Sequence, residues 1–153
     1  MLWNELTPLT LLLAVAALSL AAAVAARLLR GSRQRQISSL ARSWGMHYSA
    51  GDIFNLAPRL ASRLPVVGAS DVIVRDLIYG AEPGGHRYYL CAEYTIGVTR
   101  AKARRSCVLS ILEPRRATDP DVWQSLHFAP ENLPLVDQYQ SLRSSSAQKD
   151  AER

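Results

Sequence analysis

The first hydrophobic pattern in the chain is an unbroken run of 18 uncharged residues, 9–26. A helix rises about 1.5 Å per residue, so this run spans roughly 27 Å, close to the hydrocarbon thickness of a bilayer. Trp3 precedes the run at a place where an amphipathic ring suits the headgroup layer. The pattern therefore predicts a transmembrane anchor over residues 1–30.

The flanks of this run favour a retained anchor over a cleaved signal peptide. A secretory signal carries basic residues before its apolar stretch, and residues 1–8 contain none. The basic residues that follow the run are Arg27, Arg30, Arg33 and Arg35. By the positive-inside rule, this bias predicts a single-pass protein of the inner (cell) membrane with a cytoplasmic C-terminal domain. Residues 23–25 fit a signal-peptidase site, so cleavage stays open as the alternative.

Helical spacing follows the anchor. Within residues 34–44, apolar side chains recur at i, i+3, i+4 and i+7, namely Ile37, Leu40, Ala41 and Trp44. A break is expected before this helix at Gly31, and Gly45 suits its C-terminus. Asp52 is expected to cap a second helical segment that holds Ile53, Phe54, Leu56, Leu60 and Leu64.

Three strand-like runs come next, at residues 72–79, 86–94 and 106–112. The first two are joined by Pro83-Gly84-Gly85, a strong turn signal, and short connections favour an antiparallel meander. The predicted class is therefore α+β: a transmembrane helix, then two helical segments packed on one face of a small antiparallel sheet of about three strands. This α+β domain is expected over residues 31–116.

Composition changes beyond the strands. Residues 1–116 carry 15 basic and 7 acidic side chains, whereas residues 117–153 carry 3 and 6. We expect a Pro-rich extension over 117–143 with a short helix at 135–142. Residues 144–153 are polar and lack large apolar side chains, which predicts a disordered tail.

Several of these segments together resemble a group of small bacterial proteins of unknown activity. The run 41–48, Asp52, the strand-like stretch 74–80 and the tyrosine-rich stretches 88–90 and 93–94 carry the resemblance, which covers about residues 34–114. In such proteins an N-terminal membrane helix precedes a compact α+β domain. The resemblance implies this architecture, and it implies no ligand, activity or catalytic residue.

No arrangement of chemistry-bearing residues emerges from the sequence. His47, His86 and His127 lie on different segments without metal-ligand spacing, so we expect no metal and no cofactor. The chain has no nucleophile elbow, phosphate loop or zinc-protease motif, so no catalytic residue is assigned. If two strands fold back around residue 99, Cys91 and Cys107 face each other, close enough for a disulfide. In a reducing cytoplasm they are then two small buried hydrophobic residues.

The densest charge lies between the second and third strand-like runs. It consists of Arg100, Lys102, Arg104 and Arg105, which we predict to be exposed at a hairpin. Anionic lipid headgroups, nucleic acid and an acidic protein all suit such a cluster. Nucleic acid is disfavoured, because no aromatic residue between 96 and 107 is available for base stacking. The alternative is a solvated turn whose charges protect a sheet edge.

These observations favour a membrane-anchored, non-enzymatic module that binds a protein partner or the anionic membrane surface. The alternative is a small membrane-associated enzyme or ligand-binding domain with a pocket between helices and sheet, lined by Tyr48, Tyr88, Tyr89 and Tyr94. Small residues four apart in the anchor, Ala17, Ala21 and Ala25, also allow a homo-oligomer through helix–helix contact.

Overall fold

A computed structural model describes residues 8–64, 66, 68–97, 102–115 and 123–151. It forms two compact units, Met1–Arg35 and Gln36–Arg153. Helix α1 (Pro8–Ser43) supplies the described part of the first unit and also the start of the second. The remaining elements are five strands and two further helices, all within the second unit.

In the first unit, α1 exposes large apolar side chains all round, among them Leu12, Leu18 and Leu29. A stretch of α1 is long and apolar enough to cross a membrane, with a mean hydropathy of 2.2 and no buried residue in its most apolar window. Signal sequences pass the same test of length and composition. The break expected at Gly31 is wrong, because the helix continues through it. A single interior glycine costs a helix only about 1 kcal/mol.

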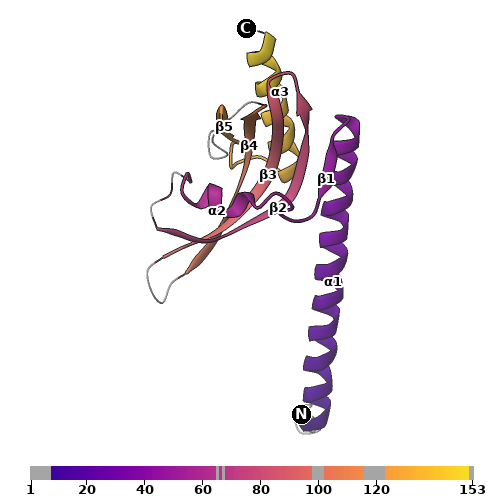
Figure 1. The fold of residues 1–153 in the computed structure, drawn as a ribbon. Coiled ribbons are helices and arrows are strands. Elements are labelled where there is room, and N and C mark those ends of the chain that lie inside the picture. The colour runs from indigo at the N-terminus through magenta and orange to yellow at the C-terminus, as the bar shows by residue number, and fades with distance from the viewer. Residues whose placement is uncertain (1–7, 65, 67, 98–101, 116–122, 152–153) are drawn as a thin grey trace. The chain divides into compact units, whose positions relative to one another are not determined.

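The second unit contains a five-stranded antiparallel sheet in the order β1-β2-β3-β4-β5 (Figure 1). Its strands are β1 (His47–Ser49), β2 (Ala69–Glu82), β3 (Gly85–Ile96), β4 (Ala103–Pro114) and β5 (Ser125–Phe128). The antiparallel meander is confirmed, but the sheet has five strands instead of three. The sequence did not reveal β1 and β5 because each has only three or four residues.

The β2–β3 turn requires glycine at the start of β3. Glu82 pairs with Gly85 across the turn, and Gly85 also pairs with Pro114 of β4. A Cβ atom on Gly85 would lie 1.9 Å from the main-chain oxygen of Glu113. No side chain fits that distance, so the close approach of β3 to β4 depends on this glycine.

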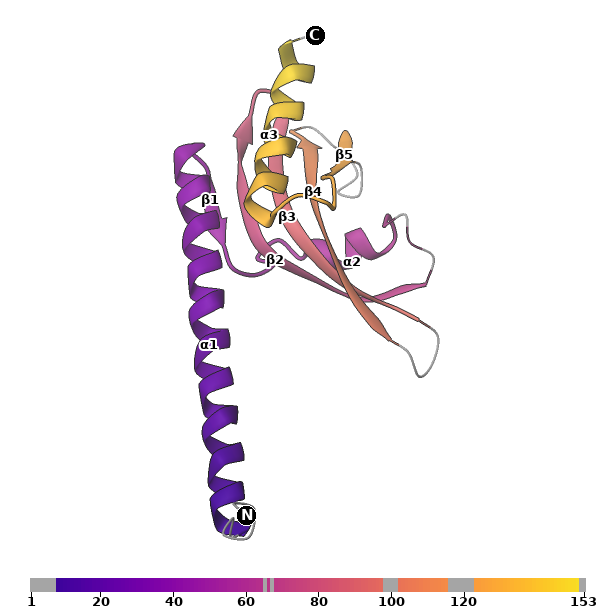
Figure 2. The ribbon, with the colours of Figure 1, turned by 180° about the vertical axis from the view of Figure 1, so that it is seen from behind.

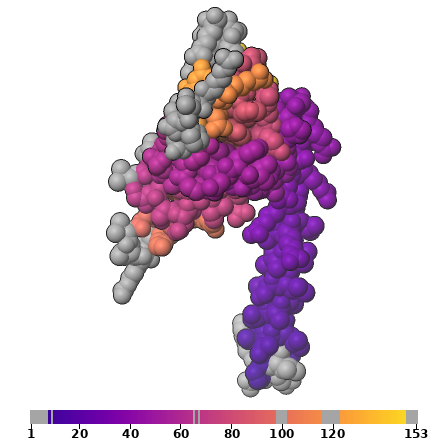
Figure 3. Space-filling model, in the orientation of Figure 1, coloured from indigo at the N-terminus to yellow at the C-terminus, as the bar shows by residue number. Residues whose placement is uncertain are grey.

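Helices cover both faces of the sheet. Helix α2 (Leu56–Ala61) lies over one face (Figure 3). Its Leu56 and Leu60 are fully buried. Helix α3 (Leu135–Ala151) lies over the opposite face (Figure 2). The last turns of α1 join α3 there, with Ile37 and Ala41 fully buried in the same core cluster. The expectation that the helical segments share one face is therefore wrong.

Asp52 bonds the first N–H groups of the second helical segment, as a cap does, but the N-cap position is Asn55 and the helix is shorter than expected. The two carboxylate oxygens of Asp52 accept hydrogen bonds from the main-chain N–H groups of Leu56 and Ala57, each at 2.8 Å. Ile53 and Phe54 lie before the helix and are exposed. Asn55 adopts a left-handed conformation between them and α2, which ends the preceding loop.

The disordered tail expected over 144–153 is also wrong for the residues that the structure describes, because α3 continues to Ala151. Tyr139 and Leu142 are buried, and Ser146 follows on the same helical stripe at 3 % exposure. Ser146 is a small polar residue at a buried position where an apolar side chain is usual. The buried stripe of α3 therefore extends beyond Leu142, its last large apolar residue.

Candidate functional site

The predicted basic segment lies at the start of β4. Arg100 is outside the described residues, whereas Lys102, Arg104 and Arg105 are all exposed. The β3–β4 hairpin carries them beyond the parts of the strands that α2 and α3 cover (Figure 1). We call Ala103–Cys107, together with Lys102, the basic strand end.

Strand alternation divides these cations between the two faces of the sheet. Arg104 pairs with Thr95 and Arg105 with Tyr94, so their side chains leave opposite faces. On the face of Arg104, Glu93 contacts Arg104 at 3.6 Å and Arg75 at 3.1 Å. The Glu93 side chain is 19 % exposed, and those of Arg75 and Arg104 are 48 % and 60 % exposed. One carboxylate is thus shared by two exposed guanidinium groups, which leaves this face positive.

The basic strand end is also an open sheet edge within the described part of the chain. β5 pairs with β4 only from Leu109 to Leu112. Beside it, the N–H groups of Ala129 and Gln124 donate to the main-chain oxygens of Val108 and Leu112, at 2.8 Å each. The main-chain groups of these even-numbered residues therefore point away from β3. By the two-residue period of a strand, those of Arg104 and Ser106 do so too.

The opposite edge of the sheet is built differently. β1 pairs with β2 only at Leu77–Tyr79, and the β2–β3 register shifts twice in the first part of β2, between Ser70 and Ile73 and between Arg75 and Ile78. Each shift contains an aspartate at positive φ, Asp71 at 52° and Asp76 at 50°. These shifts are β-bulges, which twist a strand and interrupt regular pairing. The β3–β4 ladder runs from Gly85 to Ile96 without such a shift.

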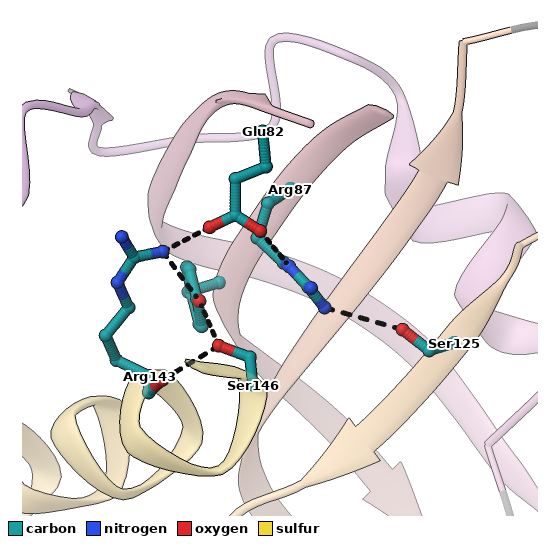
Figure 4. A network of polar contacts seen from close by, with 6 residues as sticks. Glu82, Arg87, Ser125, Arg143 and Ser146 are labelled. Carbon is teal, nitrogen blue, oxygen red and sulfur yellow. Dashed lines mark hydrogen bonds and ion pairs between the residues drawn. The ribbon is translucent and has the colours of Figure 1, made fainter. Parts of the chain in front are cut away.

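A second group of charges is buried around Glu82 (Figure 4). One carboxylate oxygen of Glu82 accepts from Arg87 Nε at 2.8 Å, and the other contacts Arg143 of α3. The Arg87 side chain is 4 % exposed and that of Glu82 is 11 % exposed. The Tyr89 hydroxyl lies 2.9 Å from the Ser146 hydroxyl and accepts from Arg143. This network ties the β2–β3 hairpin to α3.

The ionisation of Arg143 fits this structural role. Burial alone lowers its pKa, but the hydrogen bond from Arg143 to Tyr89 and the charge of Glu82 outweigh burial and raise the pKa above its ordinary value. Arg143 also lies 5.7 Å from the centre of the Trp44 ring. A guanidinium group held in this way stays charged and joins helices and sheet.

Two other carboxylates are engaged in structural contacts. Tyr48 Oη donates to Asp76 Oδ1 at 2.8 Å. Glu113 accepts from Arg59 at 2.9 Å and from the hydroxyl of Tyr88 at 3.0 Å. Burial, followed by the hydrogen bond and charge of Glu113, raises the pKa of Tyr88 to about 12. These contacts join β1 to β2, and α2 to β3 and β4.

The predicted opposition of Cys91 and Cys107 is wrong by one residue. Cys91 pairs with Val108, and Cys107 pairs with Ala92. Because a one-residue shift moves a side chain to the other face, the two thiols belong to different core clusters. Both cysteines are buried and neither forms a disulfide, and burial is the main cause that raises the pKa of Cys107 to about 12.

The structure separates the residues of the alternative ligand pocket. Tyr88 and Tyr94 belong to the core cluster on the α2 face, whereas Tyr89 and Tyr48 pack in the cluster on the α3 face. A shallow groove of about 500 Å³ does lie between the end of α1 and α3. Its lining residues carry no titratable group: Gln36, Ser39, Leu40, Ser43 and Val136.

The histidines lie on three strands, with His47 on β1, His86 on β3 and His127 on β5. Across the described ranges, no three His, Cys, Asp or Glu side chains come together in a group that could hold a metal ion. The Glu82 network was not predicted from the sequence. Its one available signal was the placement of Glu82 and Arg87 on either side of the Pro83-Gly84-Gly85 turn, which puts them close across a hairpin.

Comparison of the chain with protein-family models, with curated proteins and with solved structures finds no match.

Proposed function

We propose that this chain is a membrane-anchored, non-enzymatic binding module whose basic strand end binds a protein partner. The observation that carries the proposal is the open, regular edge of β4, exposed from Ala103 to Ser106 and flanked by cations. The buried charges around Glu82 already serve to join structural elements, whereas those of the basic strand end face solvent. A surface of this kind suits recognition of an anionic partner.

The anchor in this proposal is the apolar part of α1. Its length and composition match a membrane span, and its neighbouring arginines all follow it in the sequence. This asymmetry supports an inner-membrane protein with its domain in the cytoplasm. A tethered domain meets membrane-bound partners at a raised effective concentration, so even a small binding surface suffices.

The position of the cations favours a protein partner over the anionic membrane surface. A basic residue close to a lipid surface contributes about 1 kcal/mol. Arg104 and Arg105 leave opposite faces of the sheet, so a planar surface lying against one face meets only one of them. A polypeptide that follows the edge of β4 contacts both.

The proposal is tested by capture of partners from native membranes with the tagged full-length chain. The double variant Arg104→Ser/Arg105→Ser is compared with Arg42→Ser, which removes an exposed arginine of α1. We expect the wild type and Arg42→Ser to retain the same partner and the double variant to lose it. Equal capture by all three chains would show that the basic strand end is not the binding surface.

A second experiment distinguishes binding to the membrane surface from binding to a protein. The full-length chain is placed in nanodiscs of neutral or of anionic lipid, and hydrogen exchange is followed at residues 102–106. We expect equal exchange in the two lipids. Slower exchange in anionic lipid that disappears in the double variant would assign the surface to lipid headgroups instead.

A further inference from the structure

We propose that the basic strand end binds an extended acidic segment of the partner as an additional β-strand beside β4. This inference rests on the proposed function and specifies how the partner is recognised. The edge has five residues, Ala103–Cys107, and at about 3.3 Å per residue it offers roughly 16 Å for pairing. Strand addition of this kind derives its affinity from main-chain hydrogen bonds and its specificity from side chains.

The main-chain groups needed for pairing are in place. Arg104 and Ser106 are exposed, and their N–H and C=O groups point away from β3 by the alternation that Val108 and Leu112 establish. The β3–β4 ladder has no register shift, so β4 is a regular strand along this edge. The edge of β2 lacks that property, because it is bulged at Asp71 and Asp76. Of the two edges, β4 is therefore the one that can pair with a partner strand.

The charges select the chemistry of the added strand. A second copy of this chain that paired through the same edge would place arginines opposite or diagonal to arginines, which is destabilising. An acidic strand gains from the same arrangement. Since Arg104 and Arg105 leave opposite faces, the best partner has two consecutive acidic residues, because neighbouring side chains of a strand also leave opposite faces.

The test uses the full-length chain in neutral-lipid nanodiscs and a fluorescent synthetic peptide, Thr-Val-Glu-Glu-Val-Thr, followed by anisotropy. We expect saturable binding that weakens as salt is added. Two control peptides keep the side chains but carry methyl groups on one or the other set of alternate amides. Methylation of the amides that face β4 should abolish binding. Equal binding by all three peptides would mean that charge alone holds the peptide, and strand addition would be wrong.

Ser106 offers a matched pair of variants. Its N–H points away from β3, so Ser106→Pro removes an edge donor without removing a ladder hydrogen bond. We expect Ser106→Pro to weaken peptide binding about tenfold, as expected for one hydrogen bond, and Ser106→Ala to leave it unchanged. Near-UV circular dichroism and thermal melting of both variants check that the fold is retained.

A charge swap provides a test that does not depend on loss of binding. The variant Arg104→Glu/Arg105→Glu should release the Glu-Glu peptide and bind Thr-Val-Lys-Lys-Val-Thr instead. Failure of the swap, together with unchanged binding to Ser106→Pro, would overturn strand addition at β4. The proposed function would still stand if capture of the native partner depended on Arg104 and Arg105, so the two failures are distinguishable.

Discussion

At the scale of single residues, Glu82 is the carboxylate on which two guanidinium groups depend. Its side chain and that of Arg87 are almost fully buried. Removing one member of a buried ion pair leaves an uncompensated charge, which typically costs about 3–5 kcal/mol. We therefore expect Glu82→Gln to lower the free energy of unfolding by an amount in this range. Chemical denaturation of the full-length chain in detergent measures it.

Glu93 is the matched control, since it also serves two arginines. Its partners Arg75 and Arg104 are 48 % and 60 % exposed, and exposed ion pairs contribute about 0–1 kcal/mol. We expect Glu93→Gln to change the free energy of unfolding by less than about 1 kcal/mol. Similar losses in both variants would mean that burial does not set the importance of the Glu82 network.

The hydroxyl of Tyr88 gives the stability a dependence on alkaline pH. Its pKa is raised from 10.0 to about 12 in the folded chain, mainly by burial and then by Glu113. A raised pKa means that the folded state holds the proton more tightly than the unfolded state. The stabilisation is therefore complete below pH 10 and is lost between about pH 10 and 12. Denaturation curves should show this decline, and Tyr88→Phe should show a shallower one across the same range.

Expectations about single residues succeeded where they depended only on neighbouring positions in the sequence. Asp52 caps its helix because a capping side chain needs only its own neighbours. The opposition of Cys91 and Cys107 failed because it depended on the turn between β3 and β4, and an error of one residue there reverses the face of every side chain. The same alternation separates Arg104 from Arg105, which the density of charge in the sequence did not reveal.

At the scale of elements, β2 contains two bulges, whereas the sequence predicted only an uninterrupted strand over residues 72–79. Each bulge places an aspartate in a left-handed conformation, at Asp71 and Asp76. This conformation is costly for most residues and tolerated by aspartate, asparagine and glycine. The sequence shows only that an aspartate recurs five residues on, and this spacing does not by itself distinguish a bulge from an exposed position.

Asp71 is exposed, which makes it suitable for testing the bulge. We expect Asp71→Gly to be neutral or slightly stabilising, because glycine adopts positive φ freely. Asp71→Val should lower the free energy of unfolding by about 1–3 kcal/mol, since a β-branched residue is strained there. Thermal melting of the two variants compares them. Equal melting temperatures would mean that the positive φ at Asp71 does not constrain this strand.

At the scale of the whole molecule, the sequence predicted the class and the central meander, but it placed the two helical segments that follow the anchor on one face of the sheet. The run from Tyr88 to Ala92 is apolar without interruption, and all five residues are buried. Such a run indicates a strand covered on both faces. The second face is covered by the last turns of α1 together with α3, and the part of α3 was missed because its buried stripe ends in Ser146 and its composition is polar.

The orientation of the chain in the membrane is the prediction on which the proposed function most depends. The arginines near the apolar stretch, Arg27, Arg30, Arg33 and Arg35, all follow it, and the residues before it include no basic side chain. Cytoplasmic flanks carry such an excess of positive charge, so we expect an uncleaved anchor with the domain in the cytoplasm. A reporter that is active only outside the cytoplasm, fused after Arg153, should stay silent, and a cytoplasmic reporter at the same place should be active.

Mass spectrometry of the purified chain should return the full length. A mature chain shorter by about 25 residues would identify the stretch as a signal peptide. In that case the basic strand end would meet partners outside the cytoplasm, and membrane tethering would have to be abandoned.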